Sequence, residues 1–140
     1  MIRKVTVNDV NDINALGQNL HKNFTSVFHI ETEINKDDTI ILVVESNGII
    51  SGYLYALKLM DNIDLLSIYV SAEYRNNNLG YALLNNLQEE AIDKEILLEV
   101  STKNIAAMNL YKKVGFTKIG IRKNYYDDSD AIVMRWKNEK

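Results

Sequence analysis

A chain of 140 residues with no cysteine and a formal net charge of −3 excludes several kinds of protein. Disulfides, thiolate metal sites and a cysteine nucleophile cannot occur, and the negative charge argues against nucleic acid as the main partner. No apolar run approaches the ~20 residues of a membrane span, and the first residues, MIRKVTVND, show no secretion signal. We therefore expect a cytoplasmic location without membrane contact. Because the chain has only two histidines, His21 and His29, we also expect no metal cofactor.

Length and composition fit one domain over residues 1–140. Apolar residues make up 46% of the chain and can supply a sizeable core, while the 25% of charged residues is typical of globular proteins. The sequence shows neither repeats nor a linker, and nothing in it indicates an oligomeric state.

The first half of the chain has the residue patterns of several strands and of one helix. Val10, Ile13, Leu16 and Leu20 recur at helical spacing, and the Asn-Gly pair at 47–48 is a strong hairpin signal. The predicted elements are a strand over 2–7, a helix over 8–20 capped by Asn8, a short helix with a loop over 22–36, and strands over 38–46, 49–60 and 63–70.

The second half interleaves helices with strands. Leu79, Ala82, Leu83 and Leu87 share one stripe of a predicted helix, and Gly115 is a typical signal for the end of another. The predicted elements are helices over 79–93 and 104–115 and strands over 94–101, 116–126 and 130–136.

The order of these elements predicts the fold class. Strands 63–70 and 95–101 are joined through a helix, and such a crossover makes two strands of one sheet parallel. The strands joined by tight turns are antiparallel. We therefore predict a three-layer α/β (α+β) domain in which a mixed central sheet of about six to seven strands carries helices on both faces.

A polar loop, Arg75-Asn-Asn-Asn-Leu-Gly80, separates the strand ending at Val70 from the next helix. The first N–H groups of a helix have no intrahelical partner, and together with the helix dipole they form an anion site. Asparagine tolerates the left-handed backbone that such a loop needs, and Arg75 adds a guanidinium suited to phosphate. The loop can thus hold a phosphate or pyrophosphate. The alternative is a polar turn with an exposed arginine.

Three motifs resemble the GCN5-related N-acetyltransferase (GNAT) family. Arg75, Asn78 and Gly80 fall on its acetyl-CoA-binding pattern of Arg or Gln, two residues, Gly, any residue, then Gly or Ala, although Asn78 replaces the usual glycine. The stretch LLEVSTKNIAAMNLYKKVGF at 97–116 resembles the next strand and helix of the family. RKNYYDDSDAIVM at 122–134 resembles the branch that acetylates protein N-terminal amines.

This resemblance covers the whole chain and implies one N-acetyltransferase domain with a GNAT-like fold. It implies direct transfer of acetyl from acetyl-CoA to a protein N-terminal α-amine of the ribosomal-protein-alanine type. The strand backbone would pair with the pantetheine amides, which requires a bulge or splay in the sheet. The residues expected against acetyl-CoA are Ile68, Tyr69, Val70, Arg75, Asn76, Asn77, Asn78, Leu79, Gly80, Tyr81 and Asn104, the last of which would also cap a helix.

Glu99 is the candidate general base. It lies in the apolar run ILLEVS, where a carboxylate is not expected, and alternation places it on one face with Leu97 and Ser101. A carboxylate partly removed from water has a raised pKa and accepts a proton better near neutral pH. The pattern alone equally allows a sheet-edge glutamate paired with a lysine. The Leu-Glu-Val of the family favours catalysis, either directly or through a bridging water.

Tyr111 is the candidate general acid. A phenol aimed into a cleft can protonate a departing thiolate or hold its sulfur by a hydrogen bond. A tyrosine in an amphipathic helix is more commonly a core aromatic, but the family carries a tyrosine at this position in the acid role.

Tyr125 and Tyr126 are the candidate substrate-binding residues, and the alternative is an aromatic pair at a strand end. The acidic residues Asp127, Asp128 and Asp130 could favour a positively charged amine. The other wall of the groove is expected from residues around 21–34, where Phe24, Phe28 and His29 offer apolar and polar surface without an assigned role.

Three other functions remain open on the sequence alone. A small-molecule amine acetyltransferase is disfavoured by the Asn-Tyr-Tyr ending. A non-catalytic acetyl-CoA-binding module is disfavoured because both Glu99 and Tyr111 are present. A nucleotide-binding P-loop is disfavoured because the Gly-Lys-Ser/Thr ending is missing.

Overall fold

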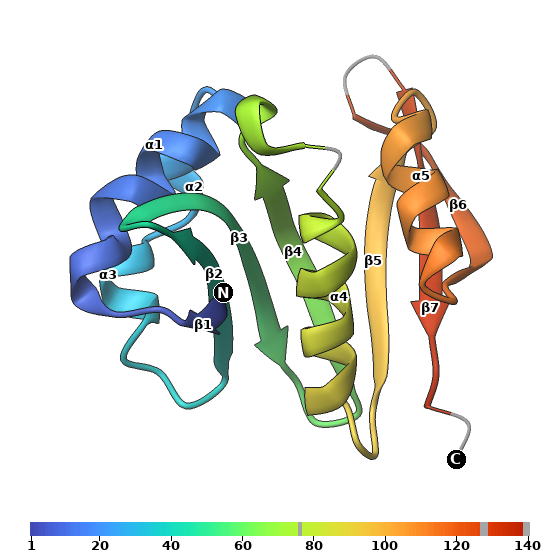
Figure 1. The fold of residues 1–140 in the computed structure, drawn as a ribbon. Helices are drawn as coiled ribbons and strands as arrows, with labels where there is room; N and C mark the ends of the chain where they lie inside the picture. Colours follow the sequence, from blue (N-terminus) through green and yellow to red (C-terminus); the bar gives the residue numbers. More distant parts are fainter. Residues whose placement is uncertain (76, 127–128, 139–140) are drawn as a thin grey trace.

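The computed structural model describes residues 1–75, 77–126 and 129–138 and places one sheet between two helical layers (Figure 1). The described strands form a mixed seven-stranded sheet in the order β1-β2-β3-β4-β5-β7-β6, so the predicted three-layer α/β fold is confirmed. The strands are β1 (Ile2–Lys4), β2 (Thr39–Ser46), β3 (Ile49–Lys58), β4 (Asn62–Val70), β5 (Glu95–Ser101), β6 (Thr117–Tyr126) and β7 (Ser129–Trp136). The helices are α1 (Val10–Leu20), α2 (Phe24–Val27), α3 (Ile30–Glu33), α4 (Leu79–Glu90) and α5 (Ile105–Lys113).

The apolar run in β2 explains why helices cover both faces of the sheet. Ile40, Leu42 and Val44 pack into the core under α4 and α5, whereas Ile41 and Val43 pack into the core with α1, α2 and α3. Because successive side chains of a strand point to opposite faces, an unbroken apolar run must be buried on both of them. No helix within the described residues is long and apolar enough to span a lipid bilayer.

The amino-terminal segment differs from the prediction. β1 is shorter than the predicted strand over 2–7, because Val7–Asp9 form a short 3-10 turn ahead of α1. Asn8 lies inside this turn and does not cap α1, so that part of the prediction was wrong. The turn lets the buried carboxylate of Asp9 receive two hydrogen bonds from the guanidinium of Arg3, at 2.8 and 2.9 Å. This pair joins β1 to the 3-10 turn, and the helical spacing of apolar residues from which α1 was predicted does not indicate it.

Replacing Asp9 by asparagine is expected to destabilise the fold by about 2 kcal/mol, since a bidentate charged pair loses its carboxylate. The hydrogen bonds from Arg3, followed by those from Thr6, lower the pKa of Asp9 in the folded protein. This stabilisation is therefore present above ~pH 3.9, the ordinary aspartate value, and is lost as the pH falls through the lowered one. Thermal melts of both proteins from pH 7 to pH 3 test this, and a gap in Tm that widens toward acid would contradict it.

The remaining elements follow the predicted order, with shifts at their ends. Asn47 and Gly48 both take positive φ, at 54° and 79°, which is the hairpin geometry that the Asn-Gly pair predicts. Gly115 takes φ 101° directly beyond α5 and its neighbour Val114, as expected of a residue that ends a helix. The predicted helix over 79–93 ends at Glu90.

The sheet opens between β4 and β5, and this opening positions the site. The two strands are parallel, as predicted, but Asn62–Asp64 pair with Glu95–Leu97 only, after which the strands diverge (Figure 1). β4 also carries a bulge at Leu66 in its pairing with β3. The predicted splay and bulge are both present. Backbone groups of β4 that face the opening therefore have no partner strand there and can bind a ligand.

Candidate active site

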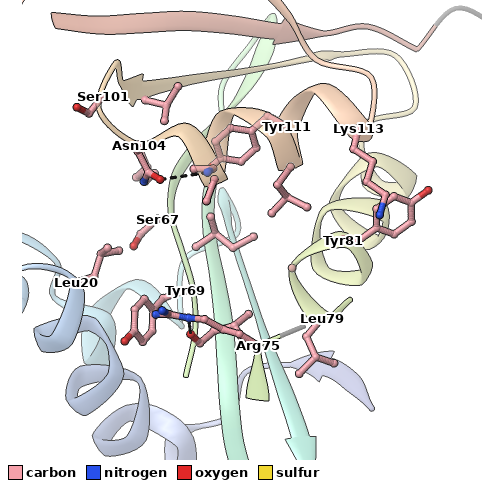
Figure 2. A pocket seen from close by; sticks show the side chains of 18 of the residues that line it. Leu20, Ser67, Tyr69, Arg75, Leu79, Tyr81, Ser101, Asn104, Tyr111 and Lys113 are labelled. Atoms are coloured by element: carbon pink, nitrogen blue, oxygen red, sulfur yellow. Dashed lines mark hydrogen bonds between the residues drawn. The ribbon is translucent and has the colours of Figure 1, made fainter. Parts of the chain in front are cut away.

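A cavity of about 700 Å³ lies at the opening between β4 and β5 and extends over the first turn of α4 and along α5 (Figure 2). The fold thus brings together residues that lie far apart in the sequence. The predicted site residues that line this cavity are Ile68, Tyr69, Val70, Arg75, Asn78, Leu79, Gly80, Tyr81, Glu99, Asn104, Tyr111 and Tyr126.

Three predicted site residues are not placed in this cavity. Asn77 does not line it, and its side-chain amide instead donates a hydrogen bond to the Tyr74 carbonyl at 3.2 Å. Tyr125 also lies outside the lining and is 52% exposed. Asn76 falls outside the described residues, as do Asp127 and Asp128.

The amino-terminal end of α4 forms one end of the cavity. Asn78 takes φ 60° and ψ 24°, so the left-handed conformation predicted for this loop is confirmed. Among the described residues, the first backbone N–H group of α4 that donates to a carbonyl is that of Ala82, which lies 3.0 Å from the Asn78 oxygen. The N–H groups of Leu79, Gly80 and Tyr81 precede it, have no carbonyl partner among the described residues, and can bind an anion.

Two cations lie near this end of the cavity. Arg75 donates from Nε to the Val70 carbonyl at 2.9 Å, and its guanidinium lies 5.2 Å from the centre of the Tyr69 ring. Lys113, at the end of α5, places Nζ 5.1 Å from the centre of the Tyr81 ring, and Figure 2 shows the two side chains together. The combination of free N–H groups and two positive charges favours a phosphate-bearing ligand.

If this loop holds the pyrophosphate of acetyl-CoA, as the resemblance implies, replacing Asn78 by valine should weaken CoA binding, whereas replacing it by glycine should preserve binding. A β-branched residue in the left-handed region costs about 1–3 kcal/mol, and glycine pays no such steric cost. Calorimetric titration of both variants with CoA measures the difference. Equal affinities for the two variants would mean that the backbone conformation at Asn78 does not shape the site.

The amino-terminal end of α5 forms the opposite wall. Asn104 accepts a hydrogen bond from the Ala107 N–H at 3.1 Å, so the predicted N-cap is confirmed, and it also lines the cavity. The two helices approach closely, since a Cβ added to Gly80 would lie 3.1 Å from Cδ2 of Leu110. A small residue at position 80 therefore allows α4 and α5 to close this side of the cavity.

Glu99 and two tyrosines lie at the inner end. The side chain of Glu99 is 26% exposed, and its Oε1 lies 3.4 Å from Nε of Arg122. Tyr111 is buried, and burial raises the pKa of its phenol well above the usual range, with a smaller contribution from Tyr126. Burial, followed by Tyr125 and Glu99, also raises the pKa of Tyr126. A carboxylate and two protonated phenols therefore converge on one region.

The β6–β7 hairpin turns Tyr126 toward this region. Residues 123–125 of β6 stand opposite the single Asp130 of β7. Asn124 takes φ 54°, and its N–H donates to Asp130 Oδ1 at 2.8 Å. Tyr126 pairs with Ser129 on the same face as Arg122 and Ala131, and the preceding Tyr125 points away, so Tyr126 lines the cavity while Tyr125 is exposed. Asp130 is thus engaged within the hairpin.

A family comparison agrees with this geometry. The model of the acetyltransferase (GNAT) family matches residues 11–116. The chain belongs to the GNAT family.

Individual GNAT relatives support the same assignment. Ribosomal protein bS18-alanine N-acetyltransferase of Escherichia coli (strain K12) is 35% identical over 95 residues, which cover 63% of this chain and 64% of that protein. A crystal structure of the E. coli ribosomal-protein-S18-alanine N-acetyltransferase superposes with a TM-score of 0.80 and 26% identity, over 100% of this chain and 97% of that one. An N-alpha-acetyltransferase of Sulfurisphaera tokodaii is 30% identical over an alignment of 151 positions, which covers 95% of this chain and 90% of the relative. The chain thus spans just under two thirds of the E. coli sequence relative, and 65% of one from Bacillus subtilis (strain 168).

Several cavity residues of this GNAT protein were missed from the sequence. Lys113 is a cation at the end of a helix, which is a common local pattern. This pattern does not indicate which residues of a neighbouring helix lie beside it. In the expected wall over 21–34, His21 alone among the described residues lines the cavity, and Phe24 is buried in the core instead. The lining residues that were not predicted are Leu20, Leu66, Ser67, Tyr74, Val100, Ser101, Ala106, Ala107, Leu110 and Lys113.

Proposed function

We propose that this protein is an acetyl-CoA-dependent N-acetyltransferase that acts on a protein N-terminal α-amine of the ribosomal-protein-alanine type. This proposal is supported by one observation: Glu99 and Tyr111 line the same cavity as the start of α4, whose first N–H groups can bind an anion. The names of the E. coli and S. tokodaii relatives support transfer to an N-terminal amine.

In this proposal, coenzyme A lies along the opening between β4 and β5. Its pyrophosphate would bind the N–H groups at the start of α4, with Arg75 and Lys113 nearby. Its pantetheine amides would bond to the free backbone edge of β4 at Ile68–Val70, opposite Asn104. Arg75 already occupies the Val70 carbonyl, so the amide contacts are expected at the preceding backbone groups.

The residues of the inner end would then carry out the transfer. The amine nitrogen attacks the thioester carbonyl carbon, a C–N bond forms and the C–S bond breaks. Glu99 takes a proton from the attacking amine, directly or through water, and Tyr111 gives its proton to the departing thiolate. The raised pKa of Tyr111 keeps its proton in place until the thiolate forms. Tyr126 would face the first residue of the peptide.

An acetyl-transfer assay tests the proposed function. Peptides that differ only at their first residue are compared with free spermine, and CoA release is measured at fixed acetyl-CoA. We expect transfer to peptides, with a dependence on the first residue. Transfer to spermine alone would favour a small-molecule acetyltransferase. CoA binding without any transfer would indicate a non-catalytic acetyl-CoA-binding module.

A further inference from the structure

The two carboxylate oxygens of Glu99 have different surroundings. Oε1 lies 3.4 Å from Nε of Arg122, whereas Oε2 is buried and has no hydrogen-bond partner among the described residues. A buried carboxylate oxygen is normally hydrogen-bonded, because leaving it unpaired costs free energy. Oε2 is enclosed by the protein, so the exposed part of the Glu99 side chain, which lines the cavity, belongs to its other atoms.

Arg122 reaches Glu99 across a strand. It lies on the edge strand β6, Glu99 lies on β5, and β7 runs between them. Ala131 of β7 pairs with Arg122 on one side and with Ser101 on the other, so these three side chains share one face. The distance between β6 and β5 is about 9.6 Å, twice the spacing of paired strands, which is within reach of an arginine. The small side chain of Ala131 leaves the path open.

A second contact holds the guanidinium in place. The Arg122 Cζ atom lies 5.4 Å from the centre of the Tyr125 ring, and that ring packs edge-on against Tyr126 at 5.1 Å. The 59% exposed Arg122 is therefore kept between an aromatic face and the Glu99 carboxylate. This also gives Tyr125, which lies outside the cavity, a contact with the site through Arg122.

We propose that Arg122 is a positioning residue that binds Oε1 of Glu99 and thereby fixes the orientation of the carboxylate toward the acceptor amine. This inference rests on the proposed function. The amine proton passes to the Glu99 carboxylate as the C–N bond forms, and the leaving thiolate takes its proton from Tyr111. Arg122 gains and loses no proton, and it contributes only by fixing the orientation of the carboxylate.

Kinetics of Arg122→Gln with a peptide acceptor test this role. We expect kcat to fall about tenfold or more, because a misplaced base loses its alignment with the amine, while the KM for acetyl-CoA stays unchanged. Arg122→Lys should recover part of the loss, since a lysine retains the charge. Lys118→Gln removes one charge from the same edge strand and serves as the matched control, with kcat unchanged. Circular dichroism tests whether each variant is folded. If Arg122→Gln does not fold, the kcat of Arg122→Lys is compared with that of the wild type instead.

A double mutant separates positioning from a general structural role. If Arg122 acts through Glu99, then Glu99→Gln with Arg122→Gln is no slower than Glu99→Gln alone. Losses that multiply would overturn the inference, as would a wild-type kcat in Arg122→Gln. Failure of the proposed function looks different, because the wild-type protein itself would then transfer no acetyl group to any peptide.

Discussion

Replacing Glu99 by glutamine is expected to lower kcat for acetyl transfer to a peptide amine by about 100-fold or more, the range typical of a lost general base. Glutamine keeps the shape of the side chain but cannot accept the amine proton. The loss should be smaller at high pH, because an α-amine with a pKa near ~8 is then already largely neutral and needs less help. Steady-state rates from pH 6 to pH 9.5 measure this dependence, alongside acetyl-CoA binding by calorimetry, which should be unchanged.

Glu95 offers a matched control for this substitution. It lies on the same strand and the same face as Glu99, but at the far end of β5, where its carboxylate lies 3.9 Å from Arg135. Glu95→Gln therefore removes one carboxylate from β5 without touching the cavity, and its rate should match the wild type. A loss in Glu99→Gln that is constant across pH would show that Glu99 does not act as the base.

Replacing Tyr111 by phenylalanine is expected to lower kcat by roughly 100-fold, because the departing thiolate would lose its proton donor. Phenylalanine retains the ring that packs on Phe116, with centroids 5.9 Å apart, so the fold and CoA binding should survive. Burial raises the pKa of Tyr111, and the phenol therefore stays protonated throughout the assayed range. Its contribution should accordingly show no alkaline loss up to pH 9.5.

The control for this variant is another buried tyrosine. Tyr55 packs in the opposite core, outside the cavity lining, so Tyr55→Phe removes a hydroxyl from the interior without changing the site. Its kcat should match the wild type. Equal rates for Tyr111→Phe and the wild type would remove the acid assignment. A loss that appears in CoA affinity and not in kcat would mean that Tyr111 binds the cofactor only.

The local sequence pattern was sufficient to predict the structure wherever the conformation of a segment depends on its own residues. The apolar run at 40–44 requires burial on both faces, and the crossover between β4 and β5 requires parallel strands. Asn78 at a helix entry predicted a left-handed residue, and Asn104 predicted an N-cap. In each case the cause lies within a few residues of the effect, so the sequence carries it directly.

Contacts between distant segments could not be found in this way. Ser67 is a small polar residue in an apolar strand, and only the register of β3 against β4 places its hydroxyl 2.7 Å from that of the buried Tyr53. The Asn8 cap failed for a related reason. The hydrogen bonds from Arg3 to Asp9 stabilise a 3-10 turn that local helix signals do not include.

The sequence by itself determined the order of the elements, the three-layer fold and the candidate residues on β4, α4, β5 and α5. It could do so because periodicity, turns and caps are local properties. The tertiary structure decided which candidates meet. It ends the pairing of β4 and β5 early, brings Lys113 beside Tyr81, and sets which face of the β6–β7 hairpin, and hence Tyr126 and not Tyr125, lines the cavity. These outcomes depend on strand register and helix packing, which combine many weak contacts across the whole chain.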